Sequence, residues 1–177
     1  MKSYKVIFIG DSGVGKTSII KAFIGEDVRK TTSTIGVDFY HFTKDGEKIV
    51  VWDFAGQEWF KDIVTNFIKG AIIVVMVFDL SKTSTLLNLI NYWALQLVKQ
   101  GAGRSFVLVV GNKADKKQIP DDFIQRVLDI LKEKVNFRFY IETSALMGRN
   151  ISAVFNNIFD LVKVIDMVVR KKLGGGE

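Results

Sequence analysis

Residues 10–18, GDSGVGKTS, have the G-x-x-x-x-G-K-T spacing of a phosphate-binding loop. The glycines let backbone N–H groups curl around a phosphate at φ/ψ values that side chains disfavour. Lys16 adds a positive charge for the β- and γ-phosphates, and the Thr17 hydroxyl can coordinate Mg²⁺. A helix expected directly afterwards points the positive end of its dipole at the same anion. The spacing therefore predicts a nucleotide site that includes Asp11, Ser12, Gly13, Val14, Gly15, Lys16, Thr17 and Ser18.

Three further polar segments each follow an apolar run that is typical of a buried strand. They are residues 53–57 (DFAGQ), residues 112–115 (NKAD) and Ser144-Ala145. Ligands of parallel α/β sheets bind beyond the carboxyl ends of the strands, where such segments meet. We therefore expect these segments and the phosphate-binding loop to form a single site.

The segment Asn112-Lys113-Ala114-Asp115 indicates which base the nucleotide carries. The Asp115 carboxylate can accept two hydrogen bonds, and guanine offers two adjacent donors, its N1–H and its 2-amino group. Adenine offers neither at that edge, so bound ATP would leave a buried carboxylate unpaired at a cost of several kcal/mol. The pattern N-K-x-D by itself is an ordinary turn. Placed after a central strand in a chain with a phosphate-binding loop, it predicts specificity for guanine.

The elements that must position these residues alternate between strands and helices. Apolar and β-branched runs predict strands at residues 4–9, 37–43, 48–53, 71–78, 106–110 and 137–141. Helical periodicity predicts helices at residues 19–24, 86–100, 122–134 and 151–172. Ser84 is the expected N-cap of the second helix, and Gly101 is expected to end it. Residues 25–36 are expected to form a loop, and an irregular aromatic stretch is expected after Glu58.

This order of elements predicts an α/β fold with helices on both faces of a mostly parallel sheet. Asp45-Gly46, between two strand-like runs, is a strong hairpin signal and adds one antiparallel edge strand. In the last helix, one apolar stripe should pack on the sheet: Ile151, Val154, Phe155, Ile158, Phe159, Val162 and Ile165. For a second stripe of Leu161, Val164 and Val168, we expect a partner or membrane contact or burial under a neighbouring loop.

The composition sets limits on the kind of protein. A chain of 177 residues, 48% of them apolar, suits one domain with a substantial core, which we expect at residues 1–173 before a flexible glycine-rich tail at 174–177. No signal-peptide pattern and no apolar run of ~20 residues is present, so we expect a soluble, cytoplasmic protein. The net charge of +6 is spread along the chain, so no nucleic-acid partner is expected. There is no cysteine for a disulfide, a thiolate metal site or a lipid.

Taken together, GDSGVGKTS, STIGVDF (33–39), WDFAGQE (52–58), GNKAD and ETSA resemble the small GTPases of the Ras superfamily, closest to the Rab branch. The resemblance extends from residue 4 to about residue 172. It implies a P-loop NTPase G domain with a six-stranded sheet. It also implies a switch that binds GTP or GDP with Mg²⁺, hydrolyses GTP slowly, and works with an activating protein and effectors. An exchange factor is left open, as is peripheral membrane association by a route other than C-terminal lipidation.

The resemblance implies roles around the phosphates. The hydroxyls of Thr17 and Thr34 would bind Mg²⁺ directly, and Asp53 would bind it through a coordinated water. Gln57 would orient the attacking water, so the implied catalytic residues are Gln57, Lys16 and Thr34. These loops would be held in place only while the third phosphate is present.

Further roles follow from the same resemblance. The Gly56 N–H would reach a γ-phosphate oxygen. The Lys113 stem would pack on the base, Asn112 would tie its loop to the phosphate-binding loop, and the Ala145 N–H would meet guanine O6. The implied nucleotide-binding set thus adds Thr34, Gly56, Asn112, Lys113, Asp115, Ser144, Ala145 and Leu146. Phe39, Trp52 and Phe67 match aromatic positions that present an effector surface, although ordinary core packing explains them equally well.

Several positions depart from the family pattern. The aromatic that normally lies over the guanine is absent, and Val28 or Asp27 stands near its place. Thr31 replaces another customary aromatic, at the position where some relatives carry a catalytic arginine. Leu146 stands for a basic residue and Trp59 for an arginine.

Two alternatives to a hydrolysing switch remain. The first is a binding module that holds GTP or GDP without hydrolysing it, against which Gln57 argues. The second is a P-loop ATPase or kinase, which Asp115 disfavours.

Overall fold

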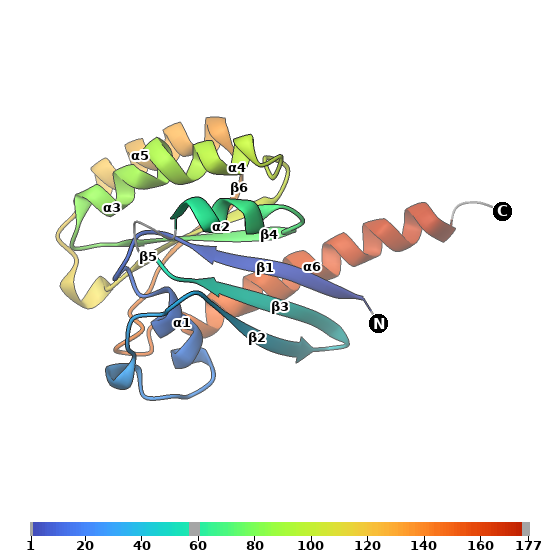
Figure 1. The fold of residues 1–177 in the computed structure, drawn as a ribbon, viewed down its shortest axis with the longest axis horizontal. Coiled ribbons are helices and arrows are strands. Elements are labelled where there is room, and N and C mark those ends of the chain that lie inside the picture. Colours follow the sequence, from blue (N-terminus) through green and yellow to red (C-terminus); the bar gives the residue numbers. More distant parts are fainter. Residues whose placement is uncertain (1, 57–60, 175–177) are drawn as a thin grey trace.

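Six strands form the central sheet of the computed structural model, which describes residues 2–56 and 61–174 (Figure 1). The strands are β1 (Ser3–Ile9), β2 (Val37–Lys44), β3 (Glu47–Phe54), β4 (Ile73–Asp79), β5 (Phe106–Asn112) and β6 (Asn136–Glu142). Their order across the sheet is β2-β3-β1-β4-β5-β6. All neighbours are parallel except β2 and β3, which are antiparallel. The predicted six-stranded α/β fold with one antiparallel edge strand is confirmed.

The hairpin between β2 and β3 turns at the predicted dipeptide. Asp45 has φ 51° and Gly46 has φ 86°, the left-handed backbone that Asp-Gly adopts at low cost. This turn sets the register in which Val37, at the start of β2, pairs with Phe54, at the end of β3.

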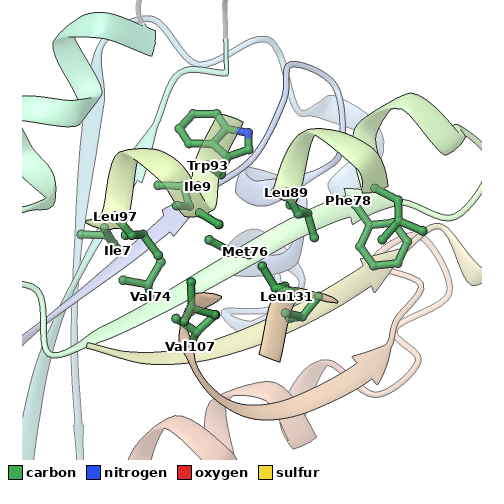
Figure 2. Packing of buried hydrophobic residues seen from close by; sticks show 14 of the residues in the cluster. Ile7, Ile9, Val74, Met76, Phe78, Leu89, Trp93, Leu97, Val107 and Leu131 are labelled. Atoms are coloured by element: carbon green, nitrogen blue, oxygen red, sulfur yellow. The ribbon is translucent and has the colours of Figure 1, made fainter. Parts of the chain in front are cut away.

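One face of the sheet is covered by five helical segments: α2 (Lys61–Ile68), α3 (Thr83–Asn88), the π-helix η3 (Leu89–Ala94), α4 (Leu95–Lys99) and α5 (Asp121–Lys134) (Figure 1). Figure 2 shows how the core here is formed, with Ile7, Ile9 and Met76 from the sheet meeting Leu89, Trp93 and Leu97 from the helices above it. Alternation along β1 sends its even-numbered residues to the opposite face.

Helices α1 (Lys16–Phe23) and α6 (Ile151–Gly174) cover that opposite face. Phe155 of α6 stacks on Phe23 of α1 at 3.8 Å between ring centroids and on Phe8 of β1 at 6.1 Å. Every residue of the predicted inward stripe of α6 is buried, which confirms that part of the prediction. Of the second stripe, Leu161 is half-buried, whereas Val164 and Val168 are about half exposed. None of the described helices is long and apolar enough to span a bilayer.

Two expectations about helices are wrong. The stretch after Glu58 contains the helix α2, because Val64 and Ile68, four residues apart, pack into the core as one helical face. The helix expected at 86–100 begins at Thr83, after Lys82 rather than after Ser84. Its first turn is held by Thr85, whose hydroxyl donates to the Lys82 carbonyl and accepts from the Asp79 N–H. One short 3₁₀ turn, η1 (Val28–Lys30), lies in the stretch expected to be loop, and another, η4 (Ala114–Lys116), begins within the Asn-Lys-x-Asp segment.

Candidate nucleotide-binding site

A cavity of about 380 Å³ lies beyond the carboxyl ends of β1, β3 and β5. All four predicted segments contribute to its wall, as does the loop before β2. The predicted residues that line it are Ser12, Gly13, Gly15, Lys16, Thr17, Ser18, Thr34, Gly56, Asn112, Lys113, Asp115, Ala145 and Leu146. Four others, Asp11, Val14, Asp53 and Ser144, lie behind the wall and act on lining residues. Gln57 lies outside the described residues.

The phosphate-binding loop is shaped by its glycines. Gly10, Gly13 and Gly15 have φ of 149°, 74° and 99°, a backbone region that L side chains rarely adopt. A Cβ at Gly15 would also lie 2.2 Å from Asn112 Nδ2. Lys16 is buried, and its ammonium donates to the carbonyls of Gly10 at 2.9 Å and Asp11 at 3.0 Å. These two carbonyls therefore hold the positive charge of Lys16 at the floor of the cavity.

Asn112, at the end of β5, joins two loops of the site. Its Nδ2 donates to the Val14 carbonyl at 3.0 Å, and its Oδ1 accepts from the Thr143 hydroxyl at 3.0 Å and from the Ala145 N–H at 3.2 Å. The side chain is 2% exposed, so these bonds form away from water. The phosphate-binding loop and the segment around Ala145 are thus fixed relative to each other.

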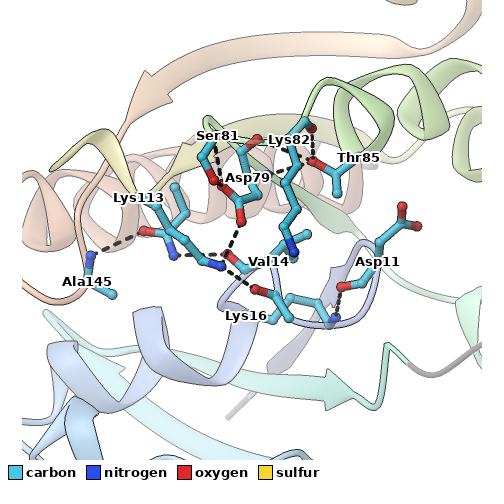
Figure 3. A network of polar contacts seen from close by, with 11 residues as sticks. Asp11, Val14, Lys16, Asp79, Ser81, Lys82, Thr85, Lys113 and Ala145 are labelled. Carbon is cyan, nitrogen blue, oxygen red and sulfur yellow. Dashed lines mark hydrogen bonds and ion pairs between the residues drawn. The ribbon is translucent and has the colours of Figure 1, made fainter. Parts of the chain in front are cut away.

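Lys113 reaches across the site to the phosphate-binding loop (Figure 3). It has a left-handed backbone with φ 65°, and its ammonium donates to the Gly13 carbonyl at 2.6 Å and to Asp79 Oδ2 at 2.7 Å. Burial opposes ionisation of Asp79, but hydrogen bonds from Lys113 and Ser81 hold the pKa of its carboxyl below the usual range. Sequence reasoning missed Asp79, although a carboxylate at the end of a central strand was a signal.

Asp115 lies on η4 with its carboxylate at the cavity wall. Its Oδ1 accepts from the Ser144 hydroxyl at 2.5 Å, and the Ser144 oxygen in turn accepts from the Met147 N–H at 3.2 Å. Ser144 therefore orients the carboxylate from behind. Asp115 is an exposed residue, so its carboxylate can be reached from the cavity.

Three oxygen-bearing side chains meet on the phosphate side. The hydroxyl oxygens of Thr17 and Thr34 lie 2.5 Å apart, and the Thr17 hydroxyl also donates to Asp53. Asp53 is fully buried, and burial raises the pKa of its carboxyl to about 6 against the opposing hydrogen bond from Thr17. Its Oδ1 has no hydrogen-bond partner among the described residues. Two hydroxyls beside a carboxylate with one buried, unpaired oxygen fit the oxygen ligands that Mg²⁺ prefers.

Gly56 closes the site from the side of β3. A Cβ there would lie 2.6 Å from Lys16 Nζ and 2.7 Å from the Asp11 carbonyl oxygen, so only glycine fits. The neighbouring Ala55 N–H donates to the Gly36 carbonyl at 2.9 Å, which ties this loop to the loop that carries Thr34. Both loops thus meet at the phosphate end of the cavity.

The cavity wall also contains residues that the sequence either left ambiguous or did not assign. Val28 lines the cavity, whereas the Asp27 carboxylate accepts from the Arg29 N–H at 3.0 Å and caps η1. Thr31 also lines the cavity, and its hydroxyl oxygen is buried without a partner among the described residues. Further lining residues that were not assigned are Thr32, Ser33, Phe54 and Lys116.

An aromatic cluster is formed by Phe39 of β2, Trp52 of β3 and Phe67 of α2. The rings of Phe39 and Trp52 are 4.7 Å apart and those of Trp52 and Phe67 are 6.1 Å apart. Lys5 Nζ stands 3.8 Å from the centre of the Trp52 ring and donates to the Phe67 carbonyl at 2.5 Å. Phe39 is 52% exposed and Phe67 is 40% exposed, so much of this cluster faces solvent.

A parallel sheet with a phosphate-binding loop after β1 and an Asn-Lys-x-Asp segment after β5 defines a P-loop domain of the GTP-binding class. Comparison with known proteins agrees. The sequence profile of the Ras family matches residues 5–164. The chain is 36% identical to the Ras-related protein Rab-11A of Dictyostelium discoideum over 162 residues, which cover 88% of the chain and 73% of that protein.

Two other relatives give the same result. The chain is 35% identical to the Ras-related protein Rab-13 of Mesocricetus auratus over 88% of its length and 77% of the relative. It is 32% identical to the Ras-related protein RABC2a of Arabidopsis thaliana over 88% of its length and 76% of the relative. The chain belongs to the Ras family of small GTPases, near its Rab branch.

Proposed function

We propose that this small GTPase is a guanine-nucleotide-dependent switch, formed by residues 1–173, that binds GTP or GDP with Mg²⁺ and hydrolyses GTP slowly. The observation that carries the proposal is the convergence of a phosphate-binding loop, an Asn-Lys-x-Asp segment and the oxygen cluster of Thr17, Thr34 and Asp53 on one cavity. The site thus offers groups suited to a base, a polyphosphate and a divalent cation.

In the GTP state, Thr17, Thr34 and Asp53 would hold Mg²⁺, which neutralises phosphate charge when bound. Lys16 would exchange its bonds to loop carbonyls for bonds to the phosphates, because charge-assisted bonds to an anion are the stronger ones. Thr34 and the Gly56 N–H would then both contact the terminal phosphate. Loss of that phosphate would release the loops that carry them.

For hydrolysis, we assign the orientation of the attacking water to Gln57. No arginine stands at Thr31, so an activating protein is the expected source of additional positive charge. Arg29 is exposed on η1 and is the alternative source within the chain. We propose that the exposed cluster of Phe39, Trp52 and Phe67 is the effector surface, because β2 and β3 connect it directly to the loops that sense the phosphate.

Nucleotide competition and single-turnover hydrolysis test the proposal. GTP and GDP should each displace a fluorescent GDP analogue in the presence of Mg²⁺, whereas ATP at the same concentration should not. Gln57→Leu should bind GTP like the wild type and lower the hydrolysis rate roughly tenfold or more, because its side chain cannot hold the water. Ser152→Ala, on the exposed side of α6, is the control and should change neither.

Two outcomes would contradict the proposal. Displacement by ATP would remove the argument for guanine specificity. Undetectable hydrolysis by the wild type, also with an activating protein, would favour a binding module that holds GTP or GDP without turnover.

A further inference from the structure

The side chain of Asp11 points away from the cavity, towards helices on one face of the sheet. Its Oδ2 accepts from Asn88 Nδ2 at 2.5 Å, and its Oδ1 accepts from the Trp93 indole N–H at 3.1 Å. These donors lie 77 and 82 residues further along the chain. Both oxygens of a carboxylate in the phosphate-binding loop are therefore held by one helical segment.

The π-helix η3 allows both donors to reach the same carboxylate. Asn88 ends α3 and Trp93 lies in η3, five residues later. At 3.6 residues per turn of an α-helix, residues five apart would point about 140° away from each other. In a π-helix the hydrogen bonds run from i to i+5, so residues five apart point in more similar directions than they do in an α-helix. Widened turns of this kind are rare and often occur at functional sites.

The backbone of Asp11 also contacts two residues proposed to bind the phosphates, Lys16 and Gly56. Its carbonyl accepts from Lys16 Nζ at 3.0 Å, and the same carbonyl lies against Gly56 so closely that a Cβ there would be 2.7 Å away. Trp93 is 1% exposed, so the donor end of this bond lies away from water, and a bond to a carboxylate is stronger than one between neutral groups. A shift of Asp11 would therefore move both the phosphate-binding lysine and the loop that carries Gly56.

We propose that Asn88 and Trp93 are positioning residues that hold the phosphate-binding loop in its binding arrangement and so slow the release of nucleotide. The inference rests on the proposed function, because it assigns a role towards the same bound nucleotide. Neither residue touches the cavity, so they should affect how long a nucleotide stays and leave the choice of base unchanged.

Release of a fluorescent GDP analogue in excess Mg²⁺ tests the idea. Trp93→Phe keeps a buried ring and removes the indole donor, and Asn88→Ala removes the amide. Each should release GDP about ten- to a hundredfold faster than the wild type, as expected for the loss of one hydrogen bond to a charged acceptor. The preference for GDP over ATP should stay as in the wild type.

Two controls separate positioning from general loosening of the core. Leu97→Ala removes a fully buried side chain of the same core cluster, and the leucine side chain has no polar atom with which to bond Asp11. At a comparable loss of melting temperature it should release GDP at nearly the wild-type rate. In a double-mutant cycle, Asp11→Ala/Trp93→Phe should release GDP no faster than Asp11→Ala alone, because the shared contact is already gone.

Wild-type release rates in both donor variants, equal acceleration in Leu97→Ala, or additive effects in the cycle would each overturn the inference. Failure of the wild type to bind GDP at all would instead overturn the proposed function. The two failures are therefore distinguishable in the same set of measurements.

Discussion

At the scale of single residues, we propose that one carboxylate, that of Asp115, selects the base. Asp115 is oriented by Ser144 and stands at the cavity wall, where the two adjacent donors of guanine would meet it. The bond from Ser144 matters because ordering a mobile side chain costs conformational entropy. A carboxylate that is already held in place does not lose that part of its binding free energy.

The change Asp115→Asn tests this role. The amide can donate to the 2-oxo group of xanthine but presents its own donors to guanine, so GDP affinity should fall by about tenfold or more and XDP affinity should rise. Competition of GDP, XDP and ADP against one fluorescent analogue measures both changes. Asp121→Asn, an exposed carboxylate at the start of α5, is the control. Unchanged GDP preference in Asp115→Asn would show that another group selects the base.

We propose that a second single residue, Val28, controls how fast nucleotide leaves. The structure resolves the ambiguity between Val28 and Asp27, since Val28 lines the cavity while Asp27 caps η1. A base stacked on an aromatic ring gains ~1–3 kcal/mol in nucleic-acid complexes, and Val28 supplies less apolar contact than a ring. We therefore expect GDP to exchange readily without a dedicated exchange factor.

The change Val28→Phe restores the ring. GDP release should slow by about ten- to a hundredfold, measured with the same fluorescent analogue. Arg29→Phe places a ring on the same short 3₁₀ turn, at an exposed position outside the main cavity, and should leave the rate unchanged. If the wild type already releases GDP slowly and Val28→Phe changes nothing, another side chain covers the base.

At the scale of elements, α6 shows two stripes with different consequences. Its inner stripe anchors the sheet through Phe155, which stacks on Phe8 and Phe23. Its outer stripe leaves Val164 and Val168 about half exposed, and the red end of the helix projects beyond the sheet in Figure 1. No described loop buries these two valines, so a partner or membrane contact there stays a prediction.

Urea unfolding distinguishes the stripes. Phe155→Ala should lower the free energy of unfolding by about 3–5 kcal/mol, because it leaves a cavity between α1, α6 and β1. Val164→Lys should change it by no more than about 0.5 kcal/mol, since the side chain already meets water. Equal losses in both variants would mean that the outer stripe is buried in solution. Retention of normal partner and vesicle binding by Val164→Lys would exclude a contact at that position.

At the scale of the whole molecule, the site follows from the order of the strands. The chain passes from β3, on one side of β1, to β4, on its other side. The helix α1, which follows β1, covers one face of the sheet, whereas α2, which connects β3 to β4, covers the other face. Ligands of open α/β sheets bind at such a reversal, outside the carboxyl ends of the strands. The end of β1 carries the phosphate-binding loop, so topology and motif select the same place.

The sequence by itself determined the chemistry of the site and the class of the fold. Both depend on patterns that are local along the chain. The G-x-x-x-x-G-K-T spacing predicts a loop conformation, and continuous apolar runs predict the buried strands. Because parallel strands place their ends at one edge, the convergence of Lys16, Asn112 and Asp115 could also be predicted without coordinates.

Only the tertiary structure decided which residues face one another across long separations. The π-turn in η3 and the bonds of Asp11 to Asn88 and Trp93 leave no local signal. Each depends on side chains brought together by packing of the helices on the sheet. For the same reason, only the packed structure shows that Phe39 is about half exposed and that Val28, rather than Asp27, lines the cavity. The exposure of a side chain depends on which neighbours pack around it in the folded chain. The residue type alone does not specify those neighbours.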